Sequence, residues 1–396
     1  ILFAENSQQN VVELKPDTVK DLALDEIVES IARGDIEKRI IGDIFKKLPL
    51  DCEDIRYRQE ILTDLMENEG LAEELEQVVD MIRTLKDYSL TKPVMMQNDH
   101  SLYLLLEKLR ELSVFVNVSE DMVKCLKGYN IKSSGLNSIL EQLEKSVNDE
   151  QFAQAKTDIV RMLEELSTVK GAMVGVNFTE DLNIEQVTTV EFVPYRIRSK
   201  YKLAEVAASM HNVMNKGDTA NSTGGIRLNT RVIDPLLVAM TPHIEKHLKR
   251  HFTKIRNVMT KYVKLDGSYV IEMYEGLTFY LALTRFGRRL RKEGFEICMP
   301  VLSDDTGNFE IKDLYNVRLF LAGEKKIVKN DFAFTPKENL YILTGPNRGG
   351  KTIIEQALGI ISVMASIGSF VTASACVGRP FTNVLTHFPI DENLTI

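Results

Sequence analysis

The sequence predicts a multidomain α plus α/β protein, in which an all-helical part is followed by an incomplete α/β domain. Three observations lead to this fold class. Apolar residues recur at helical spacing over most of residues 17–293, strand-forming residues gather after Gly294, and a glycine-rich phosphate-binding pattern follows near the C-terminus. A chain of 396 residues with 44% hydrophobic residues can form more than one core.

Composition argues against several classes of protein. A formal net charge of −8 disfavours a protein that coats nucleic acid over its whole surface, while it leaves room for a local DNA contact. The four cysteines form no C-x-x-C pair, which is typical of reduced thiols used in packing. No apolar run reaches the roughly 18 residues that cross a bilayer, and the first residues lack a secretory pattern. We therefore expect a cytoplasmic protein, and the missing initial methionine and abrupt end indicate an excised fragment.

Residues 1–171 are assigned to one domain, which is predicted to be helical almost throughout from residue 17. The apolar positions of one stretch lie three and four apart: Leu71, Leu75, Val78, Val79 and Ile82. Ser119-Glu-Asp predicts a helix start and Lys127-Gly128 a helix end. No fixed-period repeat is visible, and a generic helical bundle fits the composition of this domain.

A short β insertion is predicted at residues 172–202. Met173 to Phe178 and Gln186 to Val193 are rich in β-branched and aromatic residues and flank a turn-like segment, which predicts a β-hairpin. The stretch Tyr195 to Lys202 combines cations with two aromatics, and such residues can contact phosphates. A solvated basic face is the alternative for this stretch.

Helices are predicted to return in residues 203–293. The best flexible linker lies at 216–229, and two long helices follow at about 231–264 and 268–293. Five cations near the end of the second helix form a basic cluster: Arg285, Arg288, Arg289, Arg291 and Lys292. We expect a solvated helix end, where cations favour the helix dipole, with DNA contact as the alternative.

Three histidines in the first of these helices, His243, His247 and His251, lie four residues apart and share one helical face. Two of them could bind a metal ion. The nearest carboxylate, Glu245, points to another face, no cysteine is close, and neighbouring lysines and an arginine repel cations. A histidine row without a metal is therefore favoured.

Strand signals return in the predicted domain at residues 294–396. The candidate strands are Phe309 to Lys312, Asn316 to Leu321 and Lys326 to Phe332. Leu340 to Leu343 is predicted to be a further, buried strand, and Ile353 to Ile367 the apolar helix that follows it.

Between this strand and this helix lies the pattern G-x-x-x-x-G-K-[ST]. Its two outer glycines permit a tight turn, so that N–H groups point at phosphate oxygens beside the positive end of the helix. Lys351 is expected to reach the β- and γ-phosphates, and the Thr352 hydroxyl to bind Mg²⁺. A plain glycine turn is the alternative. The predicted binding residues are Gly345, Pro346, Asn347, Arg348, Gly349, Gly350, Lys351 and Thr352.

This loop, with the preceding Ile-Leu-Thr, closely resembles that of the MutS family of DNA mismatch-repair ATPases, which are ABC-type ATPases. The similarity continues through Ala365 to Ala373, where the family has an apolar helix end, a glycine, a strand and a small residue. Arg348 replaces the family's usual methionine, and Thr352 replaces its usual serine. The threonine keeps the hydroxyl that Mg²⁺ needs, whereas we can derive no role for the arginine.

The resemblance implies a helical lever or core domain ahead of a P-loop ATPase domain, and a short β insertion where the family carries its DNA clamp. It implies ATP and Mg²⁺ as cofactors, and it puts Ile327 and Val328 where the family contacts adenine. Core strand residues would produce the same pattern. DNA, recognised by structure or mismatch, and a second copy in a homodimer are the implied partners. The family's mismatch-reading Phe-x-Glu is matched only by Phe3-Ala-Glu5, with no room before it for that domain.

The residues after Thr352 contain neither a Walker B strand nor an ABC signature segment. We therefore expect half an ATP site, which does not hydrolyse ATP at a useful rate, and we assign no catalytic residue. The predicted function is that of a MutS-like DNA-binding ATPase, in which ATP-driven dimer closure acts on DNA repair or recombination through helical levers. A nonenzymatic SMC-like ATP-gated scaffold and a small-molecule P-loop kinase are the alternatives. No heptad coiled coil favours the scaffold, and the long chain before the loop disfavours the kinase.

Overall fold

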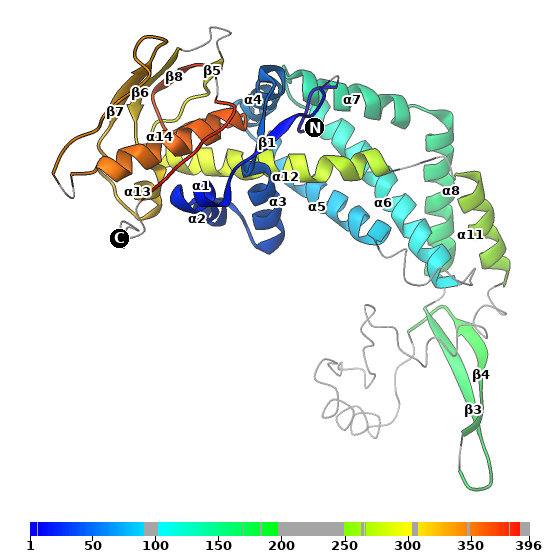
Figure 1. The fold of residues 1–396 in the computed structure, drawn as a ribbon. Coiled ribbons are helices and arrows are strands. Elements are labelled where there is room, and N and C mark those ends of the chain that lie inside the picture. The colour runs from blue at the N-terminus through cyan, green and yellow to red at the C-terminus, as the bar shows by residue number, and fades with distance from the viewer. Residues whose placement is uncertain are drawn as a thin grey trace. The chain divides into compact units, whose positions relative to one another are not determined.

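The computed structural model describes residues 1–5, 7–90, 102–168, 170–182, 184–196, 249–262, 265, 267–302, 308–346, 349–379 and 381–388. The chain divides into two compact units. The first comprises Ile1–Thr84, Asn117–Val147 and Ser268–Ile396, and the second Leu85–Val116 and Asn148–Gly267. The described part is mostly helical, with a small sheet in its C-terminal part (Figure 1). The predicted helical architecture is thus confirmed.

The first unit is built around α12 (Ser268–Lys292), which packs against α2, α3 and α4. Buried side chains lie on nearly every side of α12, as expected of a helix that is enclosed by others. These neighbours are α2 (Leu24–Ile31), α3 (Asp35–Phe45) and α4 (Cys52–Glu67). Two further helices of the unit, α1 (Pro16–Asp21) and α7 (Ser134–Val147), pack against α2 and α4 respectively. Two short strands, β1 (Val11–Glu13) and β2 (Lys47–Pro49), pair antiparallel.

Two long helices, α5 (Leu71–Leu90) and α6 (Leu102–Lys127), contribute to both units. The predicted helix end at Lys127-Gly128 is confirmed. The predicted start at Ser119 is wrong, because Ser119 is fully buried inside α6 and the helical apolar spacing continues on both sides of it. A serine within a helix can satisfy its hydroxyl locally, so a cap-like sequence does not by itself begin a helix.

The C-terminal sheet contains β5 (Val301–Leu302), β6 (Phe309–Leu314), β7 (Asn330–Phe334) and β8 (Ala375–Gly378), in the order β5-β8-β6-β7. β5 and β8 are parallel and the other pairs are antiparallel, so the sheet is mixed. Along β6, Phe309 and Ile311 are buried and alternate with exposed residues, which is the pattern of a strand with one covered face. The helix predicted after the glycine-rich loop is confirmed as α14 (Lys351–Ser366).

Two of the strands predicted between residues 294 and 339 require correction. The segment predicted as a strand at Asn316 to Leu321 is the short helix α13 (Val317–Leu321), because the Asn316 side chain accepts a hydrogen bond from the Arg318 N–H (2.9 Å) and caps a helical turn. The strand predicted from Lys326 begins only at Asn330, and Val328 is 78% exposed ahead of it.

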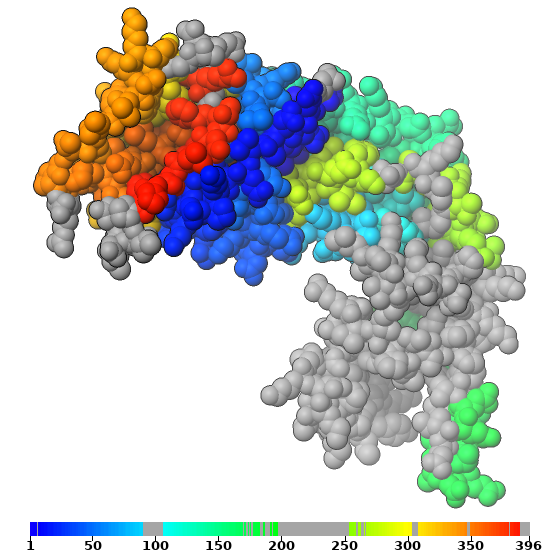
Figure 2. Space-filling model, viewed as in Figure 1, coloured from blue at the N-terminus to red at the C-terminus, as the bar shows by residue number. Residues whose placement is uncertain are grey.

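The N-terminal and C-terminal parts of the first unit are in contact. The Thr18 hydroxyl donates to the Val384 carbonyl (3.2 Å), and the Thr386 hydroxyl donates to the Asp21 carboxylate (2.8 Å). Figure 2 shows the dark blue and red residues meeting on this face. Among the described helices, none is both long and apolar enough to cross a membrane.

The second unit contains α8 (Glu150–Ser167), α11 (Lys249–Lys261) and a β-hairpin. The Tyr262 hydroxyl donates to Asp158 (2.6 Å), and Lys254 pairs with Glu165 (2.6 Å), so polar contacts join α11 to α8. The hairpin pairs β3 (Gly171–Phe178) with β4 (Ile184–Val193), which confirms its prediction. The predicted linker at 216–229, His243, His247 and the His251 side chain lie outside the described residues.

Candidate functional site

The glycine-rich loop leads directly into α14. Gly350 is the N-cap residue, with a left-handed φ of 84°, and the Gly349 N–H donates to the Pro346 carbonyl (3.0 Å). A Cβ at Gly349 would lie 2.9 Å from that carbonyl oxygen, so the turn leaves no room for a side chain. Both glycines are therefore required by the local backbone, one by conformation and the other by close approach.

Lys351, in the first turn of α14, folds back over the loop. Its ammonium donates to the carbonyl oxygens of Gly345 (2.7 Å) and Pro346 (2.9 Å). These contacts hold the cation against the loop that would receive phosphates, beside the positive end of a 16-residue helix. Phosphate oxygens would compete with these two neutral carbonyl oxygens for the ammonium. The ammonium would bind the phosphate oxygens more strongly, because they are negatively charged.

The segment before the loop is not the buried strand predicted from the sequence. Leu340 to Leu343 forms no strand, and Leu340 and Ile342 are 81% and 83% exposed. Tyr341 alone is anchored, because its ring packs edge-on against Phe332 and Phe334 of β7 and its hydroxyl donates to the Ala333 carbonyl. A buried strand needs neighbouring strands, and β7 forms the edge of the described sheet without pairing with this segment.

Side chains from several parts of the first unit hold α14 in place. The Asn316 amide donates to the Ile353 carbonyl (2.9 Å), and the Gln356 amide donates to the Asp21 carbonyl (3.1 Å). Arg318 donates to the Gln356 side chain (3.1 Å). The helix that carries the loop is therefore tied both to α13 and to the N-terminal helices.

The predicted site residues are brought together only in part. Gly345, Pro346, Gly349, Gly350, Lys351 and Thr352 form one loop and helix start, whereas Asn347 and Arg348 lie outside the described residues. Ile327 is half-buried and Val328 exposed, and their contact with adenine stays a prediction. Within the described part of the chain, no three His, Cys, Asp or Glu side chains gather as a metal site.

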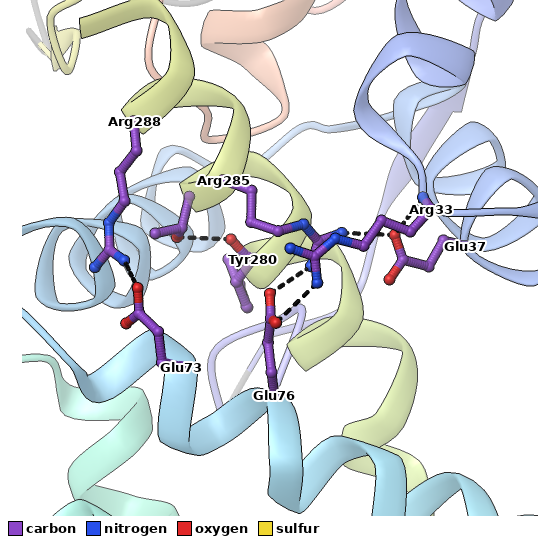
Figure 3. A network of polar contacts seen from close by, with 8 residues as sticks. Arg33, Glu37, Glu73, Glu76, Tyr280, Arg285 and Arg288 are labelled. Atoms are coloured by element: carbon purple, nitrogen blue, oxygen red, sulfur yellow. Dashed lines mark hydrogen bonds and ion pairs between the residues drawn. The ribbon is translucent and has the colours of Figure 1, made fainter. Parts of the chain in front are cut away.

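Two cations of the basic cluster predicted at the end of α12, Arg285 and Arg288, form ion pairs with carboxylates of other helices (Figure 3). Arg285 donates to Glu76 of α5 (2.9 Å) and Glu37 of α3 (2.6 Å), and Arg33 donates to the second oxygen of Glu76 (2.8 Å). The network lines a pocket of about 540 Å³. Arg285 is only 19% exposed, so a solvated helix end is the wrong description of it.

The remaining cations of the cluster differ in their surroundings. Arg288 donates to Glu73 and to the Leu65 carbonyl, where it joins α12 to α5 and α4. Arg289 lies 5.2 Å from the centre of the Phe320 ring and only loosely contacts Glu293. The exposed members are Arg289, Arg291 and Lys292. Sequence reasoning missed the network because the carboxylates lie some 200 residues earlier in the chain.

The hairpin itself carries Glu180, Asp181, Glu185 and Glu191 and neither lysine nor arginine. Its carboxylates would repel DNA phosphates. A phosphate contact in this region therefore depends on the residues after β4. Of these, Arg196 is exposed, and Arg198, Lys200 and Lys202 lie outside the described residues.

Comparison with known proteins identifies the family to which this chain belongs. The family model described as the MutS2 N-terminal domain matches residues 50–293, more than half of the chain. The chain belongs to this family, within the wider MutS group. A DNA mismatch repair protein MutS from Prochlorococcus marinus (strain MIT 9301) is 48% identical over 54 residues, which cover 14% of this chain. The match spans only 6% of that relative's length.

Proposed function

We propose that this chain is the lever-bearing part of a MutS-type ATPase, which binds ATP with Mg²⁺ at the start of α14 and acts on DNA. One observation carries the proposal. The loop turns at Gly349 and Gly350 and delivers Lys351 to the N-terminal end of a helix that is fastened to the helical body. This is the arrangement that terminal phosphates of a nucleotide require.

The residues of the loop fit a nucleoside triphosphate. The first N–H groups of α14 and the Lys351 ammonium supply donors for phosphate oxygens. Thr352, half-buried in the first turn, supplies one hydroxyl oxygen for Mg²⁺, and the ion takes its other oxygens from phosphates and water. ATP would contribute the free energy of closure in a dimer, and the helical unit would pass that closure to DNA.

Calorimetry with ATP and Mg²⁺ tests nucleotide binding. Lys351→Ala should weaken binding at least about tenfold, because the loss of a charge-assisted contact to phosphate costs about 1.5–3 kcal/mol. Lys145→Ala is the matched control, since Lys145 is an exposed lysine of α7 in the same unit and should bind as the wild type does. Equal affinity in the wild type and Lys351→Ala would remove the phosphate-loop assignment.

Gel shifts at several salt concentrations test the DNA contact. The four cations Arg196, Arg198, Lys200 and Lys202 should contact phosphates, so binding should be steeply salt-dependent and insensitive to sequence. A fourfold neutralised variant should bind duplex, mismatched and branched DNA about equally weakly and show a flatter salt slope. Unchanged binding would move the contact elsewhere, with exposed Arg291 and Lys292 as the next candidates.

A further inference from the structure

The C-terminal end of α14 rests directly on α4. Gly368, with φ +80°, ends the helix, and the Ser369 N–H donates back to the Met364 carbonyl (2.9 Å), as in a Schellman cap. A Cβ at Gly368 would lie 2.5 Å from the Cβ of Arg58 and 3.0 Å from the Ile55 carbonyl oxygen. No side chain separates the two helices at this point.

Arg58 of α4 joins this helix end to the N-terminal residues. Its guanidinium donates to the Ile367 carbonyl at the end of α14 (3.3 Å) and to the Leu2 carbonyl (2.7 Å), and it lies 5.1 Å from the centre of the Phe3 ring. Arg58 is 2% exposed, and burial lowers its pKa below the ordinary arginine value. The loss of a hydrogen-bond acceptor by a buried guanidinium costs a large free energy. We therefore expect Arg58 to keep its contacts with the two carbonyl oxygens and the Phe3 ring when one of them shifts.

Asp54, one turn before Arg58, fixes the same N-terminal residues. Its carboxylate, fully buried, accepts from the Ala4 N–H (2.9 Å) and from the Ser7 hydroxyl (2.6 Å). The described residues among 2–7 are thus bound to α4 through two buried, oppositely charged side chains. Of the two side chains, Arg58 also donates a hydrogen bond to the Ile367 carbonyl at the end of α14.

We propose that Arg58 is a positioning residue for the phosphate loop, which couples nucleotide binding at the start of α14 to the seating of residues 2–7 on α4. The proposal rests on the proposed function. A shift of α14 on nucleotide binding displaces the Ile367 carbonyl, and the buried guanidinium follows that acceptor. The Leu2 carbonyl and the Phe3 ring then follow the guanidinium, so the change at the loop reaches the N-terminal residues through one side chain.

Hydrogen–deuterium exchange in the full chain, combined with ATP calorimetry, tests the coupling. In the wild type, ATP with Mg²⁺ should change the exchange rate of amides in residues 2–7 at least about threefold. Arg58→Met keeps the apolar stem and removes the guanidinium, so it should abolish this change and weaken ATP binding at least about threefold. Arg58→Lys keeps the charge without the fork and should restore part of both.

Arg285→Met is the control, because Arg285 is also a partly buried arginine of this unit but its hydrogen bonds go to Glu76 of α5 and Glu37 of α3. It should keep ATP affinity and the ATP-dependent exchange change, even if its midpoint of thermal unfolding falls as far as that of Arg58→Met. The coupling is wrong if the wild type binds ATP through Lys351 and the exchange at residues 2–7 does not change. This result needs only the wild type and Lys351→Ala, so it can be obtained even if Arg58→Met fails to fold. Identical ATP responses in Arg58→Met and wild type also overturn it. A wild type that binds no ATP removes the proposed function and the coupling with it.

Discussion

At the residue scale, Glu76 is the carboxylate on which two arginines converge. Burial alone would raise the pKa of Glu76, but the hydrogen bonds from Arg285 and Arg33 outweigh burial and lower it. A lowered folded-state pKa means that the ion pairs stabilise the fold above the unfolded-state pKa of about 4.3. That stability is lost as the pH falls through the folded-state pKa.

We expect Glu76→Gln to lower the free energy of unfolding by about 1–3 kcal/mol at pH 7, with the difference from wild type shrinking below about pH 4. Urea unfolding at the two pH values measures this. Glu293→Gln is the control, because Glu293 and Arg289 are both about half exposed and such a pair contributes less than about 1 kcal/mol. A Glu76→Gln penalty that stays constant with pH would contradict the ion-pair account.

Two cysteines offer a second test at this scale. Burial is the main cause that raises the pKa of Cys125 and of Cys376 to about 12. Because the thiolate is the reactive form, neither should be alkylated by iodoacetamide at pH 8 in the folded chain, whereas half-buried Cys52 should react first. Peptide mass spectrometry gives the order of labelling. Early labelling of Cys376 would show that the strand β8 is more open than its described burial.

At the scale of elements, the structure and the sequence prediction differ at Leu340 to Leu343, which is an exposed segment and not the predicted buried strand. Ile342 is 83% exposed, so Ile342→Asn should change the free energy of unfolding by less than about 0.5 kcal/mol. Ile311→Ala in β6 should cost about 2–5 kcal/mol, because Ile311 is fully buried. Urea unfolding compares the two variants. A large loss in Ile342→Asn would restore the buried strand that the sequence predicts.

The elements that were predictable are those with a strong local pattern. The periodic helices, the β3–β4 hairpin and α14 follow from residue spacing alone. The segment 340–343 has the right residues for a buried strand, but burial depends on neighbours that residue spacing does not reveal. The apolar run after Asn316 predicted a strand, but the segment is a short helix. Its propensities for helix and strand are similar, and the Asn316 side chain stabilises the helix because it caps the first turn.

For the candidate site, residue spacing predicts the loop residues but not the contacts that support them. The loop pattern singles out Lys351 and its glycines, since the chemistry expected of a phosphate loop is local, and their binding of a nucleotide stays a prediction. The supports of α14 come from residues far away in the chain, such as Asp21, Arg58 and Asn316, and no local pattern marks them. For the same reason, the sequence predicted a solvated helix end for the cations of α12, whereas Arg285 contacts Glu37 and Glu76.

At the scale of the whole molecule, the match to the MutS2 N-terminal domain covers most of the long helical region ahead of the loop. The first unit joins these helices to α14 through buried polar contacts as well as apolar packing. A nucleotide at the loop would therefore act on a helix that is already part of the helical body. We propose that the nucleotide binds at this loop and at no other surface of the chain.

A crystal structure of the chain with a nonhydrolysable ATP analogue and Mg²⁺ tests that claim most directly. We predict that the Lys351 ammonium leaves the carbonyl oxygens of Gly345 and Pro346 and contacts the terminal phosphates, with the Thr352 hydroxyl on Mg²⁺. A nucleotide bound elsewhere, or bound with Lys351 still on those two carbonyls, would contradict the account.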